Sequence, residues 1–170
     1  MKKILFLLTM AFSACLIVLL YACNSKPPEI ATGGRETVLL FPRGDQDNSN
    51  NFHGEVWVKQ LVDADSLNQT AVGNVTFSPG ARSKWHLHPG GQILLVTDGV
   101  GYYQEKGQPK IILRKGDIIK CPPNTPHWHG ASADTAFVQL AITGREKGAT
   151  VWLDDVTGEE YDSKHEISVR

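Results

Sequence analysis

Hydrophobic and polar residues alternate in short runs through most of the chain, and turns rich in glycine and proline separate the runs. Alternation with a period of two is typical of half-buried strands, and no run has a convincing 3.6-residue apolar period over a helical length. The expected strands cover 36–41, 55–61, 71–77, 83–88, 92–97, 100–105, 110–113, 117–121, 127–129 and 136–143. This pattern predicts an all-β sandwich or closed barrel, with a closing turn or short helix at 151–161.

The N-terminus departs from this alternation. Lys2 and Lys3 precede an apolar run over 4–20, which is typical of an export signal. The run ends in Leu20-Tyr21-Ala22-Cys23, which resembles a bacterial lipobox, a signal in which the cysteine is lipidated and becomes the mature N-terminus. An uncleaved membrane anchor is the alternative, although about 17 residues is the short end of the spanning range.

We therefore predict three regions: a lipoprotein signal peptide at 1–22, a flexible tether at 23–35, and a single β-domain at 36–165. Lipidation of Cys23 would make the protein an exported bacterial lipoprotein, anchored to a membrane surface and facing the periplasm or the cell exterior. Cys121 is the single cysteine of the predicted domain. We expect it to be buried as a small apolar residue.

Composition and charge exclude several classes of protein. The chain is 41% hydrophobic and 21% charged, as in ordinary globular proteins. Without Lys2 and Lys3, the chain has 15 basic and 18 acidic residues, which gives a net charge of −3. Because no basic cluster follows the signal, nucleic-acid binding has no electrostatic support.

Four of the six histidines form two His-x-His pairs, and this grouping points to a metal site. Residues i and i+2 of a strand share a face, so His86 and His88 project together, as do His127 and His129. Gln92 opens the strand after the Pro-Gly-Gly turn and can lie beside His88. Imidazole and oxygen donors at this spacing suit one divalent ion. Ordinary core or surface histidines are the alternative.

The spacing of these residues resembles the two sequence motifs of the cupin family. The first motif contains Gly80, His86, His88, Gln92 and Gly99, and the second contains Gly116, Pro122 and His127, with Asn124 where the family usually has glycine. The resemblance implies a single jelly-roll barrel, or double-stranded β-helix, in which His86, His88, Gln92 and His127 hold one divalent metal. Two departures are Gln92 in place of the usual glutamate and Ala131 in place of asparagine.

Gln92 changes the electrostatics of such a site. Three neutral imidazoles and a neutral amide leave a divalent ion with its full charge, which favours an anionic partner and stabilises developing negative charge. Manganese is the expected ion, with iron, nickel, copper or zinc as alternatives. Catalysis needs open coordination positions, which disfavours closed tetrahedral zinc.

A closer resemblance covers the stretch ARSKWHLHPGGQILLVTDGVGYYQEKG from Ala81 and PPNTPHWHGA at 122–131. These strings are similar to small bacterial cupins that act as manganese-dependent (R)-selective hydroxynitrile lyases. The resemblance implies cleavage of a cyanohydrin into an aldehyde and cyanide. His129 is the candidate general base, with an orienting or plain core role as the alternative. Further pocket candidates are Val75, Phe77 and Gln139, the last at a position where these relatives often have histidine.

Three functions fit the sequence. The first is a metal-dependent lyase acting on a small hydroxy compound such as a cyanohydrin. The second is a metal-dependent dioxygenase, and the third is a non-catalytic, small-molecule-binding lipoprotein. All three imply a small-molecule partner, and we also expect a homodimer that pairs through an edge strand such as 36–41.

Overall fold

The computed structural model of the chain describes residues 39–164 and 166–168. The predicted signal peptide at 1–22, the tether at 23–35 and the lipidation residue Cys23 lie outside these residues and stay predictions. Within the described ranges, no helix is long and apolar enough to cross a membrane.

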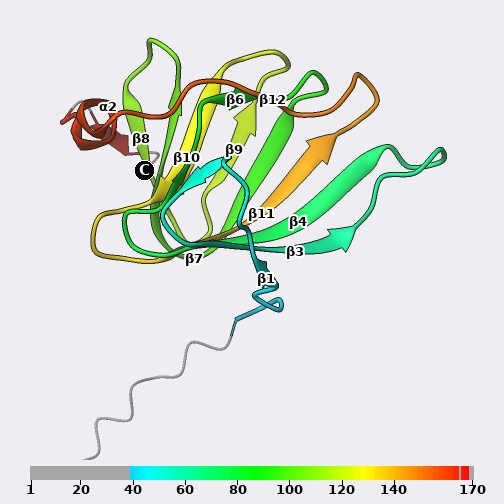
Figure 1. Cartoon of the computed structure of the whole chain (residues 1–170), viewed down its shortest axis with the longest axis horizontal. Helices are drawn as coiled ribbons and strands as arrows, with labels where there is room; N and C mark the ends of the chain where they lie inside the picture. The colour runs from blue at the N-terminus through cyan, green and yellow to red at the C-terminus, as the bar shows by residue number, and fades with distance from the viewer. Residues whose placement is uncertain (1–38, 165, 169–170) are drawn as a thin grey trace, which may run out of the picture. The chain divides into compact units, whose positions relative to one another are not determined.

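The described residues fold into two mainly antiparallel sheets that face each other (Figure 1). The first sheet contains, in spatial order, β1 (Asp45–Gln46), β3 (Val56–Val62), β4 (Thr70–Phe77), β11 (Phe137–Gly144), the first half of β7 (Gln92–Glu105) and β9 (Ile118–Cys121). Its strands pair over long registers, and β4 lies against β11 from Phe77↔Phe137 to Thr70↔Gly144. The alternating pattern of the sequence therefore forms a half-buried sheet, as predicted.

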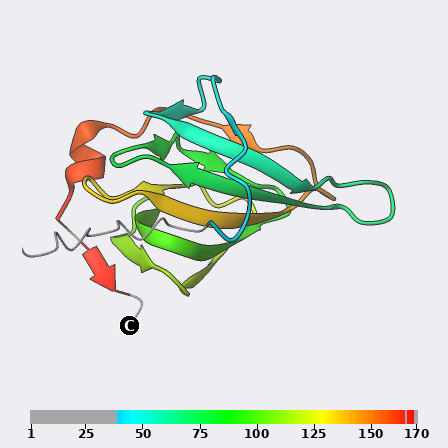
Figure 2. The same cartoon turned by 90° about the horizontal axis from the view of Figure 1, so that it is seen from below.

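The second sheet is built around β10 (His127–Ala131), which pairs with the second half of β7 on one side. Its other strands are β5 (Arg82–Ser83) and β6 (His86–Leu87) against β10, β2 (Phe52–His53) against β5, β12 (Val151–Trp152) against β6, and β8 (Lys110–Arg114) against β7. β13 (Glu166–Ser168) runs parallel to β8. Figure 2 shows the same sheets from below, with β13 at one margin.

The strand β7 corrects a prediction. The sequence predicts separate strands at 92–97 and 100–105 with a turn at Asp98-Gly99, but β7 runs unbroken from Gln92 to Glu105. Gly99 has φ of +79°, and a Cβ there would collide with the carbonyl oxygen of Ala136. Glycine therefore lets the strand bend from one sheet into the other. Pairing with neighbours on both sheets keeps the chain extended where the local sequence favours a turn.

The segment that precedes β3 also differs from the prediction. Residues 39–41, the described part of the strand expected at 36–41, have no regular secondary structure. The following polar segment, predicted as a loop, contains β1 instead, which pairs with Trp57 and Val58 of β3. Backbone groups at the sheet edge take hydrogen-bond partners regardless of side-chain polarity. A homodimer stays a prediction. Residues 39–41 do not form the edge strand through which we expected two copies to pair.

The main core lies between the two sheets and confirms the all-β prediction. Its buried members are Val56, Val75, Phe77, Ala81, Leu94, Val96, Tyr103, Leu113, Cys121, Ala131 and Phe137. Cys121 is 1% exposed, so the expectation that it is a buried apolar residue is confirmed.

A second, smaller cluster lies apart from the main core. It consists of Trp85, Trp128, Val156 and Tyr161, and Tyr161 belongs to α2 (Gly158–Asp162). Thr157 begins this helix with a capping box in which its hydroxyl accepts from the Glu160 amide. The predicted turn or short helix at 151–161 is therefore present as β12 followed by α2.

Candidate metal centre

Two neighbouring strands position four imidazoles. His86 lies on β6 and is the register partner of His127 on β10, so their side chains start from facing backbone positions. His88 follows β6 directly, and His129 lies two residues beyond His127 on the same face of β10. The ring centroid of His86 lies 4.4 Å from the ring centroid of His127, 5.0 Å from that of His88 and 5.2 Å from that of His129. The structure therefore brings both His-x-His pairs together.

One close grouping of ring nitrogens differs in membership from the predicted ligand set. The ring nitrogens of His86, His127 and His129 offer one atom each within 4.8 Å of one another. His88 and Gln92, which the sequence places in the ligand set, lie beside this group. His129, which the sequence assigns as a base, lies within it. A three-histidine cluster that could hold a divalent metal ion is thus present, with two further donors next to it.

Backbone carbonyls fix the ring orientation of two histidines. Nδ1 of His86 lies 2.9 Å from the Lys84 carbonyl oxygen, and Nδ1 of His127 lies 2.8 Å from the Thr125 carbonyl oxygen. A carbonyl only accepts, so each Nδ1 carries the proton and donates. The Nε2 lone pair of each ring is then free for another partner, as in metal-binding histidines.

The buried side-chain atoms that have no hydrogen-bond partner among the described residues include Nε2 of His88, Nε2 of His127 and Oε1 of Gln92. The Gln92 amide nitrogen donates to the Thr143 hydroxyl at 3.0 Å, which leaves its oxygen for a different partner. A buried polar atom without a partner costs about 1–3 kcal/mol. Imidazole nitrogen and amide oxygen can each coordinate a divalent transition metal through a lone pair, so these residues fit such an ion.

Burial keeps the four imidazoles neutral. Desolvation, followed by the nearby His127 and His129, lowers the pKa of His86 well below 6.5, and burial does the same for His129. Burial, then His127 and Arg145, lowers the pKa of His88 to about 3. The pKa of His127 is also lowered by burial. Neutral rings are the form that can bind a metal.

His129 is held by a residue that the sequence singled out. The Gln139 side-chain nitrogen lies 2.9 Å from Nδ1 of His129, and the Phe77 ring meets His129 edge-on with centroids 5.7 Å apart. With Nδ1 engaged, Nε2 of His129 is the ring nitrogen available to the other imidazoles. Gln139 is fully buried, and its Oε1 has no hydrogen-bond partner within the described chain.

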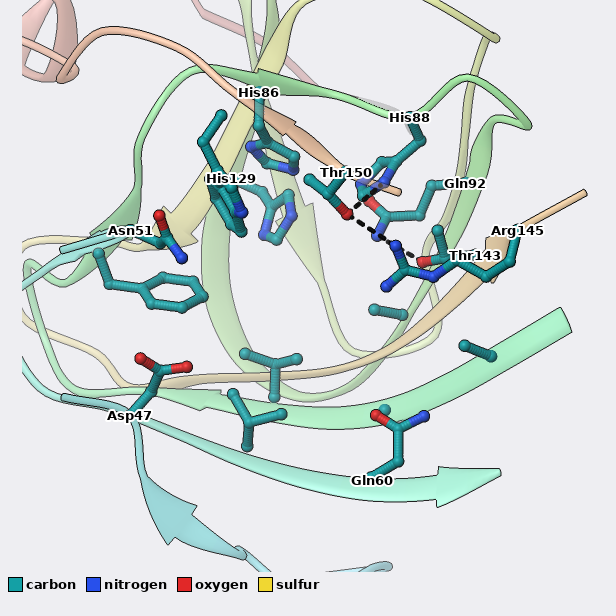
Figure 3. Close-up of a pocket in the computed structure, with 17 residues that line it drawn as sticks. Asp47, Asn51, Gln60, His86, His88, Gln92, His129, Thr143, Arg145 and Thr150 are labelled. Atoms are coloured by element: carbon teal, nitrogen blue, oxygen red, sulfur yellow. Dashed lines mark hydrogen bonds between the residues drawn. The ribbon is translucent and has the colours of Figure 1, made fainter. Parts of the chain in front are cut away.

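A cavity of about 200 Å³ opens beside the imidazoles (Figure 3). Its polar lining consists of Asp47, Asn51, Gln60, His86, His88, Gln92, His129, Thr143, Arg145 and Thr150. Its other walls are Phe52, Val58, Ala71, Gly73, Val75, Ala141 and Trp152. Of the three predicted pocket residues, Val75 lines this cavity, whereas Phe77 and Gln139 lie outside the lining and contact His129.

The lining residues that were missed from the sequence include Arg145, Thr150 and Trp152. Thr150 contacts Nδ1 of His88 at 3.1 Å, and the Trp152 ring lies 4.9 Å from that of His86. Arg145 follows the end of β11 directly. Thr150 and Trp152 reach the site because β12 pairs with β6, where Trp152 faces His86 in register. No local motif signals this long-range pairing.

Comparison with known proteins places the chain in a family. Residues 73–143 match the cupin domain family. An (R)-mandelonitrile lyase of Granulicella tundricola is 42% identical over 111 residues, which are 65% of this chain and 85% of that enzyme. An acireductone dioxygenase of Alcanivorax borkumensis is 27% identical over 78 residues, 44% of this chain but only 41% of that enzyme.

The fold agrees with these sequence matches. The crystal structure of a cupin-like protein from Thermotoga maritima has a TM-score of 0.70 and 51% sequence identity to this chain. The match covers 72% of this chain and 93% of that protein. The chain therefore belongs to the cupin family, as its two motifs and its all-β fold indicate.

Proposed function

We propose that the protein is a metal-dependent lyase that cleaves a small hydroxy compound, with a cyanohydrin as the sharpest candidate. The proposal rests on three buried atoms that could bind a metal and that have no hydrogen-bond partner in the described chain: His88 Nε2, His127 Nε2 and Gln92 Oε1. They lie beside a small cavity. The similarity to the Granulicella tundricola (R)-mandelonitrile lyase supports this reaction class.

In this proposal His86, His88, Gln92 and His127 hold one divalent ion, and manganese is the proposed metal. When bound, the ion supplies Lewis-acid stabilisation for an oxygen that gains negative charge. All four side chains are neutral, so they leave the positive charge of the ion undiminished toward the cavity. Gln92 is the distinctive member, since a glutamate at its position would cancel one charge.

His129 is the proposed proton acceptor. Cyanohydrin cleavage breaks the bond between the carbinol carbon and the nitrile carbon, the hydroxyl oxygen becomes the aldehyde oxygen, and the hydroxyl proton must leave. Nε2 of His129 can take that proton when Nδ1–H donates to Oε1 of Gln139. This arrangement requires the Gln139 amide to be flipped, so that Oε1 takes the place of Nε2 beside the His129 ring. In the structure, Oε1 has no hydrogen-bond partner in the described chain.

Cyanide release tests the lyase directly. The mature protein, loaded with manganese, is assayed with (R)-mandelonitrile and with several aliphatic cyanohydrins. We expect cyanide and aldehyde in equal amounts, loss of both in His127→Ala, and folded variant protein by circular dichroism. No cyanide from any of these compounds with metal-loaded protein would refute cyanohydrin cleavage.

A dioxygenase is the second candidate, because the chain also matches an acireductone dioxygenase. Oxygen uptake by the iron-loaded protein with a catechol or a diketone would favour it over the lyase. Tight binding of a small molecule without turnover in either assay would instead favour a non-catalytic binding protein.

We also propose that the protein is exported as a lipoprotein modified at Cys23. The basic start, the apolar run and the sequence Leu20-Tyr21-Ala22-Cys23 support this localisation. Expression in a bacterium should yield a protein that enters the detergent phase and whose N-terminal peptide carries acyl mass. Cys23→Ser should abolish both properties, and a wild-type protein without acyl mass would refute lipidation.

A further inference from the structure

The segment after β11 carries a cation into the pocket, and we propose that Arg145 forms an anion-binding subsite there. In consequence, the pocket also binds small carboxylates that bear an oxygen substituent, as in a 2-hydroxy acid. The inference rests on the proposed function, because one molecule would contact both Arg145 and the imidazoles.

The backbone and side chain of Arg145 are held in place. Its amide donates to the Gln69 carbonyl at 2.8 Å, and its carbonyl accepts from the Gly148 amide at 3.1 Å. Its Nη1 donates to the Thr150 hydroxyl oxygen at 3.1 Å, and the same oxygen lies 3.1 Å from Nδ1 of His88. The guanidinium is therefore only one hydroxyl group away from the imidazole cluster (Figure 3).

The charge of Arg145 has no carboxylate partner among the described residues. The carboxylate of the adjacent Glu146 lies against Gly90 instead. Both of its oxygens are 2.9 Å from the position that a Cβ on Gly90 would occupy. The charge lies close to the site, because Nη1 of Arg145 and Nδ1 of His88 contact the same Thr150 hydroxyl oxygen. An uncompensated guanidinium in a pocket wall is available to a ligand, and Thr150 occupies only one of its five N–H groups.

The rest of the pocket lining does not neutralise this cation. Asp47 is the acid of the lining, and Figure 3 shows it across the cavity from Arg145. Its Oδ1 accepts from the Ser49 amide at 2.8 Å, so it is engaged locally. The histidines of the lining are buried and neutral, and Gln92 is uncharged. The end of the pocket near His88 and Gln92 therefore has a net positive charge.

A carboxylate matches this arrangement in shape as well as in charge. A guanidinium presents parallel N–H donors that a planar carboxylate accepts in pairs. A ligand with its carboxylate at Arg145 would place a neighbouring hydroxyl toward the imidazoles. The apolar walls at Val58, Val75 and Ala141 would surround the remaining substituent. A neutral ligand of the same size would leave the charge of the guanidinium uncompensated.

Mandelate and mandelamide provide a matched pair of probes, because they differ in charge but hardly in shape. Both are titrated by calorimetry into manganese-loaded wild type, Arg145→Gln and Arg114→Gln. Arg114 is an exposed arginine of β8 outside the pocket, so its variant controls for net charge. We expect Arg145→Gln to weaken mandelate binding at least tenfold and mandelamide binding less than twofold. Arg114→Gln should change neither affinity, and Arg145→Lys should recover part of the loss.

Unchanged mandelate affinity in Arg145→Gln, or equal weakening of both probes, would overturn the subsite. Equal weakening together with lost manganese would assign Arg145 to holding Thr150 and His88 in place. The same titrations with metal-free protein separate this inference from the proposed function. A preference for mandelate that depends on Arg145 should persist there even if the protein binds no metal and releases no cyanide. Its absence from both forms would refute the subsite.

Discussion

Strand β10 separates two clusters that contrast in their hydrogen bonding. On one face, Nε2 of His127 is buried without a hydrogen-bond partner in the described chain. On the other face, Trp128 is equally buried, yet its Nε1 donates to Gln104 at 2.8 Å. The same holds around Trp128: the Tyr161 hydroxyl donates to the Ala131 carbonyl at 2.8 Å, and Trp85 Nε1 donates to Glu160 at 3.2 Å.

The difference separates stabilising residues from functional ones within a single strand. A cluster whose polar atoms all have partners is complete by itself and stabilises the fold. A cluster that buries polar atoms without partners lowers stability unless something binds there. The imidazole face of β10 is of the second kind, so variants on the two faces should affect different properties.

His127→Ala should have the largest effect on function. It removes a proposed ligand together with a buried atom that lacks a partner, so metal binding should weaken by more than about 100-fold, while the metal-free fold should lose less stability than in Trp128→Ala. Metal titration and thermal unfolding of the same sample measure the two effects. Wild-type metal affinity in this variant would show that His127 is not a ligand.

Trp128→Ala should do the reverse. Removing a fully buried indole should lower the free energy of unfolding by about 3–5 kcal/mol. Metal affinity of the folded fraction should change less than about threefold, because Trp128 faces away from the imidazoles. Urea unfolding and metal titration test this, with Trp128→Phe as a milder control. A stability loss no greater than in His127→Ala would refute the contrast between the faces.

Acid should destabilise the metal-free protein through its imidazoles. The pKa values of His86, His88, His127 and His129 are lowered from 6.5 on folding, so the unfolded chain binds more protons once the pH falls below that value. Stability should be insensitive to these groups above pH 6.5. It should fall by about 1 kcal/mol for each of His86, His88 and His129 between pH 6.5 and 5.5, because the pKa values of these three are lowered furthest.

Urea unfolding at several pH values measures this slope. His88→Gln has one fewer imidazole and should show a shallower decline in the free energy of unfolding. A free energy that stays level from pH 7 to 5.5 would contradict burial of neutral histidines.

Thr150→Val should have the smallest effect. It removes the hydroxyl that contacts Nδ1 of His88 and keeps a side chain of similar shape. Loss of such a supporting contact typically weakens metal affinity by about tenfold or somewhat more. Thr135→Val, at an exposed turn, is a matched control. Equal affinities in both variants would exclude a supporting role for Thr150.

The sequence predicted the parts of the molecule that depend on local alternation. The shared face of His127 and His129 and the opposite direction of Trp128 follow from the period of a strand. The continuous strand β7 could not be predicted, because pairing with β11, β8 and β10 overrides the turn signal at Asp98-Gly99.

The same limit applies to the candidate site. The predicted donors lie close together because they sit in two motifs with a recognisable spacing. Arg145 follows β11 directly, whereas Thr150 and Trp152 come from a later segment that the pairing of β12 with β6 brings to the cavity. Gln139 illustrates an intermediate case: its inward direction was predictable, but the register of β11 places it behind His129 instead of in the cavity wall.

Elemental analysis of the purified, manganese-loaded protein tests the central claim most directly. If the buried atoms without hydrogen-bond partners bind a metal, the wild type should hold close to one divalent ion per chain. Gln92→Ala should hold less, and His127→Ala should retain none. Wild-type protein without bound metal, or equal metal in all three proteins, would contradict the assignment of these buried atoms to a metal centre.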